Sequence, residues 1–248
     1  FIVASARILK RAWQIYVAHV FLFTIFLAEI SYVAASFQNP LYSEEMGIMN
    51  FLKHPDVTIV QALILRFRPV NMDVLPLYIV LLLWFSPILW LLLRSPSLGL
   101  VVSAAIYTLS WIFGWNFAAW PKGDWVFNPF AWQLLFVFGA WCALGGAQRI
   151  ARWINSPVTV ALAAVYLLFA FLIAMTWYIP SWSVYVPKFV GESIYPIDKT
   201  NLDVLRILHF LSLAVITVYF VPLDWPVLKS AWARPAIMCG QHSLGIFC

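Results

Sequence analysis

The sequence predicts an all-α protein, a polytopic transmembrane helix bundle with about six to seven spans. Three observations predict this class. Hydrophobic residues make up 64% of the 248 residues and charged residues only 10%, whereas about a quarter of the residues of a soluble domain are charged. Apolar stretches recur along the chain at the length of about 20 residues that a helix needs to cross a bilayer. The 14 tryptophans and 10 tyrosines are typical of the aromatic belts at membrane interfaces.

The first predicted span runs from Trp13 to Phe37 and contains two ionisable residues, His19 and Glu29. These two are ten residues apart, about 15 Å along a helix, and therefore cannot pair directly. Because ionisable groups are costly in lipid, we expect each of them to face neighbouring helices. A basic cluster precedes the span and consists of Arg7, Lys10 and Arg11.

A long polar connection follows over residues 38–72. Its apolar part, residues 57–67, is too short to span a bilayer and predicts an interfacial or re-entrant helix. Connections of this length are uncommon unless they serve a function, such as a lid or a substrate rim.

The strongest spanning segment is Val74 to Leu93. Asn71 or Asp73 suits the N-cap of this helix, and with Asp73 as the cap Pro76 falls in the first turn, where proline is tolerated. Further spans are predicted over residues 98–119, 130–147, 158–179 and 204–221, and another helix begins at Ala236.

The basic residues of the connecting segments predict the orientation. With the Arg7 cluster in the cytoplasm, the inner segments carry eight basic residues and one acid, and the outer segments carry seven basic residues and eight acids. Since cytoplasmic loops are enriched in lysine and arginine, this asymmetry supports the assignment. It places both long polar loops, Asp73 and the stretch from Asp203 to His209 on the extracytoplasmic side. No basic run indicates a nucleic-acid partner.

The sequence contains no P-loop, dinucleotide-binding glycine fingerprint, HExxH motif or nucleophile elbow. The histidines His19, His54, His209 and His242 lack metal-ligand spacing, so we expect no metal site.

One stretch stands out for chemistry, the polar loop that leads into the segment Val204 to Val221. We expect this helix to carry Arg206 and His209 inward, with Asp203 at its start. Steps of three residues keep these groups roughly on one side of a helix. A neutral imidazole at that depth can accept a proton from an attacking hydroxyl. The alternative is structural: Arg206 extends to the interface and His209 hydrogen-bonds across helices.

Five blocks of the chain resemble the OpgC-type membrane proteins that succinylate osmoregulated periplasmic glucans, a branch of the acyltransferase type 3 superfamily. The blocks are Ala6 to Phe23, Pro40 to Met46, Pro69 to Leu83, Phe127 to Trp141 and Tyr195 to Ala214. The resemblance implies one integral membrane acyltransferase domain over residues 1–248. It also implies a bundle of about ten spans, of which this chain holds a part without the N-terminal helices and the C-terminal end.

The resemblance further implies transfer of an acyl group from a cytoplasmic CoA thioester to a carbohydrate hydroxyl across the inner membrane of a bacterium. Acyl-CoA, most specifically succinyl-CoA, is then a co-substrate, with no cofactor and with membrane lipid and a periplasmic glucan as partners. The cluster of Arg7, Lys10 and Arg11 resembles the arginine-rich motif of the superfamily and would contact the CoA phosphates. The catalytic histidine of the first helix of the superfamily would lie upstream of Phe1.

On this basis we assign acceptor-side catalysis to His209, Asp203 and Asp73, and candidate sugar contacts to Arg66, Arg68 and Asn71, with Asp73 among them. A succinyl donor favours a cationic pocket for its free carboxylate, which Arg66, Arg68, Lys199 or Arg206 could supply. The other polar residues expected in apolar segments are His19, Glu29 and His242. Two alternatives remain open: an acyltransferase for another envelope polysaccharide, and a glycan transporter. The transporter is disfavoured because we find no internal repeat.

Overall fold

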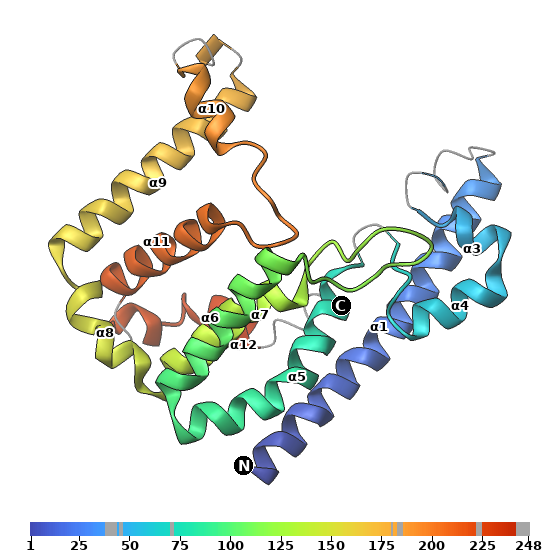
Figure 1. The fold of residues 1–248 in the computed structure, drawn as a ribbon, viewed down its shortest axis with the longest axis horizontal. Coiled ribbons are helices and arrows are strands. Elements are labelled where there is room, and N and C mark those ends of the chain that lie inside the picture. Colours follow the sequence, from blue (N-terminus) through green and yellow to red (C-terminus); the bar gives the residue numbers. More distant parts are fainter. Residues whose placement is uncertain are drawn as a thin grey trace. The chain divides into compact units, whose positions relative to one another are not determined.

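The computed structural model describes residues 1–37, 44, 47–69, 72–179, 181–182, 186–221 and 225–241 (Figure 1). In this part of the chain every regular element is helical, apart from an isolated bridge between Ala118 and Asp124, which confirms the all-α prediction. The chain divides into two compact units, described separately below. Unit 1 comprises Phe1–Leu144 with Thr200–Leu202, and unit 2 comprises Gly145–Lys199 with Asp203–Cys248.

Unit 1 is built on a series of helices that pack side by side in chain order. Helix α1 packs against α5, α5 packs against α6 and α7, and α6 packs against α7 (Figure 1). The short helices α3 and α4 pack against each other in the connection that precedes α5. The bounds of these helices are α1 Ile2–Ser36, α3 Met49–Lys53, α4 Pro55–Leu63, α5 Val74–Arg94, α6 Pro96–Phe113 and α7 Pro129–Trp141.

Helix α1 buries one stripe of side chains, formed by Ala12, Ile15, His19, Phe23 and Leu27. Their spacing of three or four residues keeps them on one face of the helix. The prediction that His19 faces neighbouring helices is therefore confirmed. The same prediction for Glu29 is wrong for the described residues, because Glu29 lies off this stripe and is exposed.

Two predicted helix ends were also wrong. Helix α1 starts eleven residues before Trp13, so the basic cluster of Arg7, Lys10 and Arg11 lies within the helix rather than before it. Helix α6 ends at Gly114, which adopts the left-handed conformation with a φ of 63°. Glycine takes this conformation without the steric cost of a Cβ atom, which explains why the helix stops there rather than at residue 119.

Helices α5 and α6 are joined by a tight turn at Ser95. Gly99, near the start of α6, packs on the buried side chain of Leu92, near the end of α5. A Cβ atom at Gly99 would lie 2.5 Å from Leu92 Cδ2 and 3.3 Å from Leu92 Cα, and Leu92 is fully buried. We therefore expect Gly99→Ala to lower the free energy of unfolding by about 1–3 kcal/mol through overpacking. Reversible unfolding of the protein in detergent measures this change.

Gly139→Ala is the matched control, because Gly139 is also helical and its Cβ would meet nothing within 4 Å. This variant should keep or raise stability, since alanine favours helix over glycine. Equal effects of the two substitutions would contradict the proposed close packing of Gly99 on Leu92.

In unit 2, helix α9 packs against α11. The Tyr166 hydroxyl of α9 donates a hydrogen bond of 2.8 Å to the Leu205 carbonyl oxygen of α11. A π-helical turn, Cys142–Gly146, precedes α8. The helices of this part are α8 Ala147–Ile154, α9 Pro157–Tyr178, α10 Lys188–Ile194, α11 Val204–Phe220, the 3-10 turn Pro226–Lys229 and α12 Arg234–Gln241.

Five helical stretches among the described residues are long and apolar enough to cross a membrane. They are Ile2–Ser36, Val74–Arg94, Pro96–Phe113, Pro129–Ile154 and Pro157–Tyr178. Helix α11 is apolar but shorter, with 17 residues. The short segment predicted at residues 57–67 overlaps α4, which has nine residues and is indeed too short to span.

Candidate functional site

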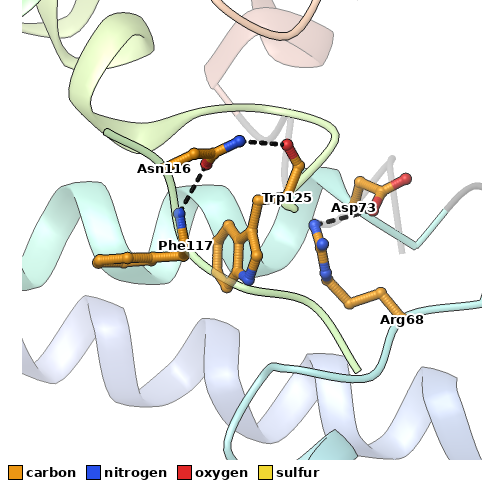
Figure 2. A network of polar contacts seen from close by, with 5 residues as sticks. All are labelled: Arg68, Asp73, Asn116, Phe117 and Trp125. Atoms are coloured by element: carbon orange, nitrogen blue, oxygen red, sulfur yellow. Dashed lines mark hydrogen bonds and ion pairs between the residues drawn. The ribbon is translucent and has the colours of Figure 1, made fainter. Parts of the chain in front are cut away.

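The most distinctive polar feature of unit 1 is a buried arginine, Arg68, in the loop between α4 and α5. Its side chain is 3% exposed, and its Nη1 atom lies 3.0 Å from Oδ1 of Asp73. The guanidinium carbon lies 4.4 Å from the centroid of the Trp125 ring, which is a cation–π arrangement. Figure 2 shows the three side chains together. Asp73 occupies the N-cap position of α5, but its carboxylate makes no capping hydrogen bond and pairs with Arg68 instead.

The backbone on the N-terminal side of Arg68 is fixed by hydrogen bonds. The amides of Arg66 and Phe67 both donate to the Gln61 carbonyl oxygen, and the amide of Trp120 donates to the Arg66 carbonyl oxygen over 2.9 Å. Leu65 adopts a positive φ of 62° at this turn, where the chain reverses after α4. These contacts hold the chain in the path that directs Arg68 into the protein.

Trp125 is held over Arg68 by the loop between α6 and α7. Its amide donates to the Phe117 carbonyl oxygen over 2.8 Å, and its own carbonyl oxygen accepts from Asn116 Nδ2 over 2.9 Å. Asn116 Oδ1 in turn accepts from the Phe117 amide over 2.8 Å. Figure 2 shows the contacts of Asn116 with Phe117 and Trp125. A single asparagine therefore sets the position of the indole that covers the guanidinium.

His19 lies next to this cluster, on the buried stripe of α1, and is 1% exposed. Its ring centroid lies 6.5 Å from that of Phe23. Phe23 contacts Phe67 edge-on, and Phe67 contacts Trp120 in the same way. The polar cluster is therefore enclosed on one side by a chain of aromatic rings.

Several donors of the cluster have no hydrogen-bond partner among the described residues: Arg68 Nε and Nη1, and Trp125 Nε1. The Nη1 atom of Arg68 is within ion-pair distance of Asp73 but outside hydrogen-bond geometry. Burial lowers the pKa of Arg68, and the Asp73 carboxylate opposes that shift, while an arginine stays protonated at physiological pH in either case. Unsatisfied buried donors are costly, so the cluster suits a ligand that brings oxygen acceptors.

An apolar groove of about 400 Å³ adjoins this cluster between α1, α3 and α4. Phe23 lines the groove, and its ring is tilted by 34° relative to the neighbouring His19 ring. The Thr24 hydroxyl on the wall of the groove is used internally, because it donates to the Val20 carbonyl oxygen over 2.9 Å. The groove therefore offers an apolar surface beside the polar cluster.

A second polar assembly of unit 1 holds the triplet Thr200–Leu202. Asn128 is fully buried, and its Nδ2 atom donates to the Trp115 carbonyl oxygen and to Asn201 Oδ1 over 2.6 and 2.8 Å. Its amide donates to the Thr200 carbonyl oxygen over 3.0 Å. Further donors to the triplet are the Trp132 and Trp111 indoles and the Tyr107 hydroxyl. These hydrogen bonds fix Thr200–Leu202, which belong to the polar loop that leads into α11.

Of the predicted residues, the structure brings together His19, Arg68 and Asp73. Arg66 is exposed at the surface of unit 1. Asn71 and His242 lie outside the described residues. The predicted donor-side cluster is exposed along the first turns of α1 and consists of Arg7, Lys10 and Arg11.

In unit 2, the prediction that α11 carries Arg206 and His209 inward is wrong for the described residues. Both side chains are exposed, because within unit 2 α11 packs against α9 and α8 and buries none of its residues. Asp203 caps the helix, with Oδ1 accepting from the Leu205 amide over 2.8 Å. His209 contacts the Tyr166 ring, with 6.3 Å between centroids. Lys199 is exposed. A catalytic role of Asp203 and His209 stays a prediction.

Sequence reasoning missed the partners of Arg68. Trp125 resembles the other interfacial tryptophans of the sequence, and Asn116 falls within the span predicted over residues 98–119. No periodic pattern links either residue to the loop that carries Arg68. A usable signal was the charge pair itself, since Arg68 and Asp73 are five residues apart in a segment that precedes a strongly apolar span.

Comparison with known proteins gives one match. The model of a family described as "OpgC protein" matches residues 1–248, which is the whole chain. Neither a curated protein nor a solved structure matches the chain.

Proposed function

Because the chain belongs to the OpgC protein family, we propose that it forms part of a membrane O-acyltransferase. Its donor is succinyl-CoA and its acceptor is a glucose hydroxyl of osmoregulated periplasmic glucans, at the inner membrane of a bacterium. The observation that carries this proposal is the family match over the full length of the chain, since that family suggests an acyltransferase that modifies glucans. The apolar helices long enough to cross a membrane support the membrane setting.

In this reaction the oxygen of a sugar hydroxyl bonds to the acyl carbon, and the carbon–sulfur bond of the thioester breaks. The hydroxyl proton ends on the departing CoA thiolate. Such a reaction needs a base and preorganised donors for the developing oxyanion.

Helix α1 carries both the basic residues proposed to bind the CoA donor and His19, which adjoins the buried cluster. Arg7, Lys10 and Arg11 are exposed near its start, as the binding of CoA phosphates requires. They precede His19 by about 12–18 Å along the helix axis. An extended pantetheine arm is of this order of length, which supports a path from the phosphates toward the cluster.

On the acceptor side, Asp73 supplies a carboxylate that is partly exposed, at 15%, and can accept hydrogen bonds from sugar hydroxyls. Arg66 is an exposed cation that directly follows the turn at Leu65 and joins Asn71 as a proposed sugar contact. In unit 2, Asp203 and His209 are proposed acceptor-side residues, and Lys199 and Arg206 are nearby in the sequence. Another envelope polysaccharide remains the alternative acceptor.

We expect Asp73→Ala and His209→Ala, made in the full-length protein, each to reduce glucan substitution by at least tenfold, because each removes a group assigned to the acceptor. Mass spectrometry of glucans extracted from cells that carry each variant measures this. Asp124→Ala is the matched control, since Asp124 is an exposed carboxylate without an assigned role. Normal substitution by both variants, inserted in the membrane at wild-type levels, would overturn these assignments.

A further inference from the structure

Arg68 differs from every other basic residue whose side chain the structure describes. All other lysines and arginines of that set are exposed, including Arg66, Lys199 and Arg206, whereas the Arg68 side chain is 3% exposed. A buried charge is costly unless it is paired and its hydrogen bonds are made. Arg68 is paired with Asp73, but its Nε and Nη1 donors have no hydrogen-bond partner among the described residues. Arg68 is therefore a buried cation with N–H donors that have no partner among the described residues.

The direction from which a ligand can reach these donors is restricted. The Trp125 ring covers one face of the guanidinium at 4.4 Å, so a ligand that uses the free Nε donor has to lie near the plane of the guanidinium. Donors of a guanidinium lie in that plane and match the two oxygens of a carboxylate. A further unpartnered donor of the cluster, Trp125 Nε1, adds to the demand for oxygen acceptors.

Asp73 satisfies this demand only in part. Its Oδ1 atom lies 3.0 Å from Nη1 but outside hydrogen-bond geometry, and its side chain is more exposed than that of Arg68. A carboxylate that binds through the Nε edge would share the guanidinium with Asp73 or displace it toward solvent. A sugar hydroxyl offers a single oxygen and no charge, and so leaves donors of the cluster unmatched.

We propose that Arg68, covered by Trp125, binds the terminal carboxylate of a dicarboxylic acyl group and thereby selects this acyl class over uncharged acyl groups. The proposal rests on the proposed acyltransferase function and makes Arg68 a specificity-determining residue of it. Asp73 is the counter-ion of Arg68 while no acyl carboxylate is bound. Four cations were predicted as candidates for binding this carboxylate. Arg68 is the one whose burial and unpartnered donors suit that role.

The test compares two donors of equal chain length, succinyl-CoA and butyryl-CoA, with the full-length protein reconstituted in lipid vesicles. The wild type should prefer the succinyl donor. Arg68→Gln should lower kcat/KM for the succinyl donor by about 100-fold, as expected for loss of a charge-assisted bidentate contact, and leave that for butyryl-CoA within a few-fold. Lys122→Gln, a change at an exposed lysine of the loop that carries Trp125, should change neither. An equal loss for both donors would overturn the proposal.

A binding measurement separates this inference from the proposed function. Equilibrium binding of radiolabelled free succinate should be detectable with the wild type, lost in Arg68→Gln and at least as tight in Asp73→Asn, because the competing carboxylate is removed. If the wild type transfers neither acyl group, the proposed function is wrong and succinate binding alone decides the role of Arg68. Succinate binding that is equal in wild type and Arg68→Gln would overturn that role.

Discussion

Replacing Trp125 by alanine should lower the free energy of unfolding by about 3–5 kcal/mol, the range measured for large aromatic residues removed from protein cores. Trp125 is 3% exposed, contacts Phe117 edge-on with 5.5 Å between ring centroids and covers the Arg68 guanidinium. Its removal leaves a cavity and uncovers a buried cation. Unfolding of the purified protein by denaturing detergent, followed by circular dichroism, measures the loss.

Two further variants separate the contributions of Trp125. Trp125→Phe keeps a ring over Arg68 and removes an indole N–H that has no partner among the described residues, so it should cost much less than alanine. Trp232→Ala, at a side chain that is 94% exposed, should leave stability unchanged. A Trp125→Ala variant as stable as Trp232→Ala would contradict the proposed packing of the indole on Arg68.

Removal of the Asp73 carboxylate should be about as damaging. Asp73→Ala leaves the Arg68 guanidinium buried without its counter-ion, and breaking a buried ion pair from one side costs about 3–5 kcal/mol. The double variant Arg68→Met/Asp73→Ala should recover most of this loss, because no unpaired charge then remains. The same detergent unfolding experiment measures both variants.

Asp124→Ala serves again as the control, because Asp124 is exposed and its loss should change stability by less than about 0.5 kcal/mol. If the single and double variants at Asp73 lose the same free energy, the two residues are not coupled. That outcome would contradict the ion pair as a determinant of stability.

The spans were predictable where apolar composition alone decides the structure. Helices α5, α9 and α11 begin and end within one residue of the predicted segments, because each is a continuous apolar run between polar loops. Helix α1 was predicted too short, since its first three turns carry Arg7, Lys10 and Arg11 and so lack the apolar signal. The helix nevertheless continues through these charged residues, because lysine and arginine themselves favour helix.

The candidate site was predictable in part. Arg68 and Asp73 were singled out as polar groups beside a span, and His19 as a buried polar group, but the contact among them depends on how α1 packs against α5. The cover of Arg68 by Trp125 depends on a loop that is set by Asn116 through two hydrogen bonds. Contacts of this kind join segments far apart in the sequence, and no pattern of spacing encodes them.

The prediction for His209 shows the limit of an argument from burial cost. The spacing of Asp203, Arg206 and His209 places them roughly along one side of a helix, but it does not tell which helices cover that side. Within unit 2, α11 has α9 and α8 as neighbours, and both Arg206 and His209 remain exposed. The free-energy cost of ionisable groups in lipid therefore predicted burial correctly for His19 and incorrectly for His209.

The most direct test of the central claim, acyl transfer to a glycan, is a labelling experiment with the full-length protein in sealed vesicles. Radiolabelled succinyl-CoA is supplied on the side of the Arg7 cluster and glucan on the other side. The account predicts that label becomes attached to glucan through an alkali-labile ester, with release of one CoA thiol for each ester formed. Movement of unmodified glucan across the membrane without thiol release would contradict it and would identify a transporter.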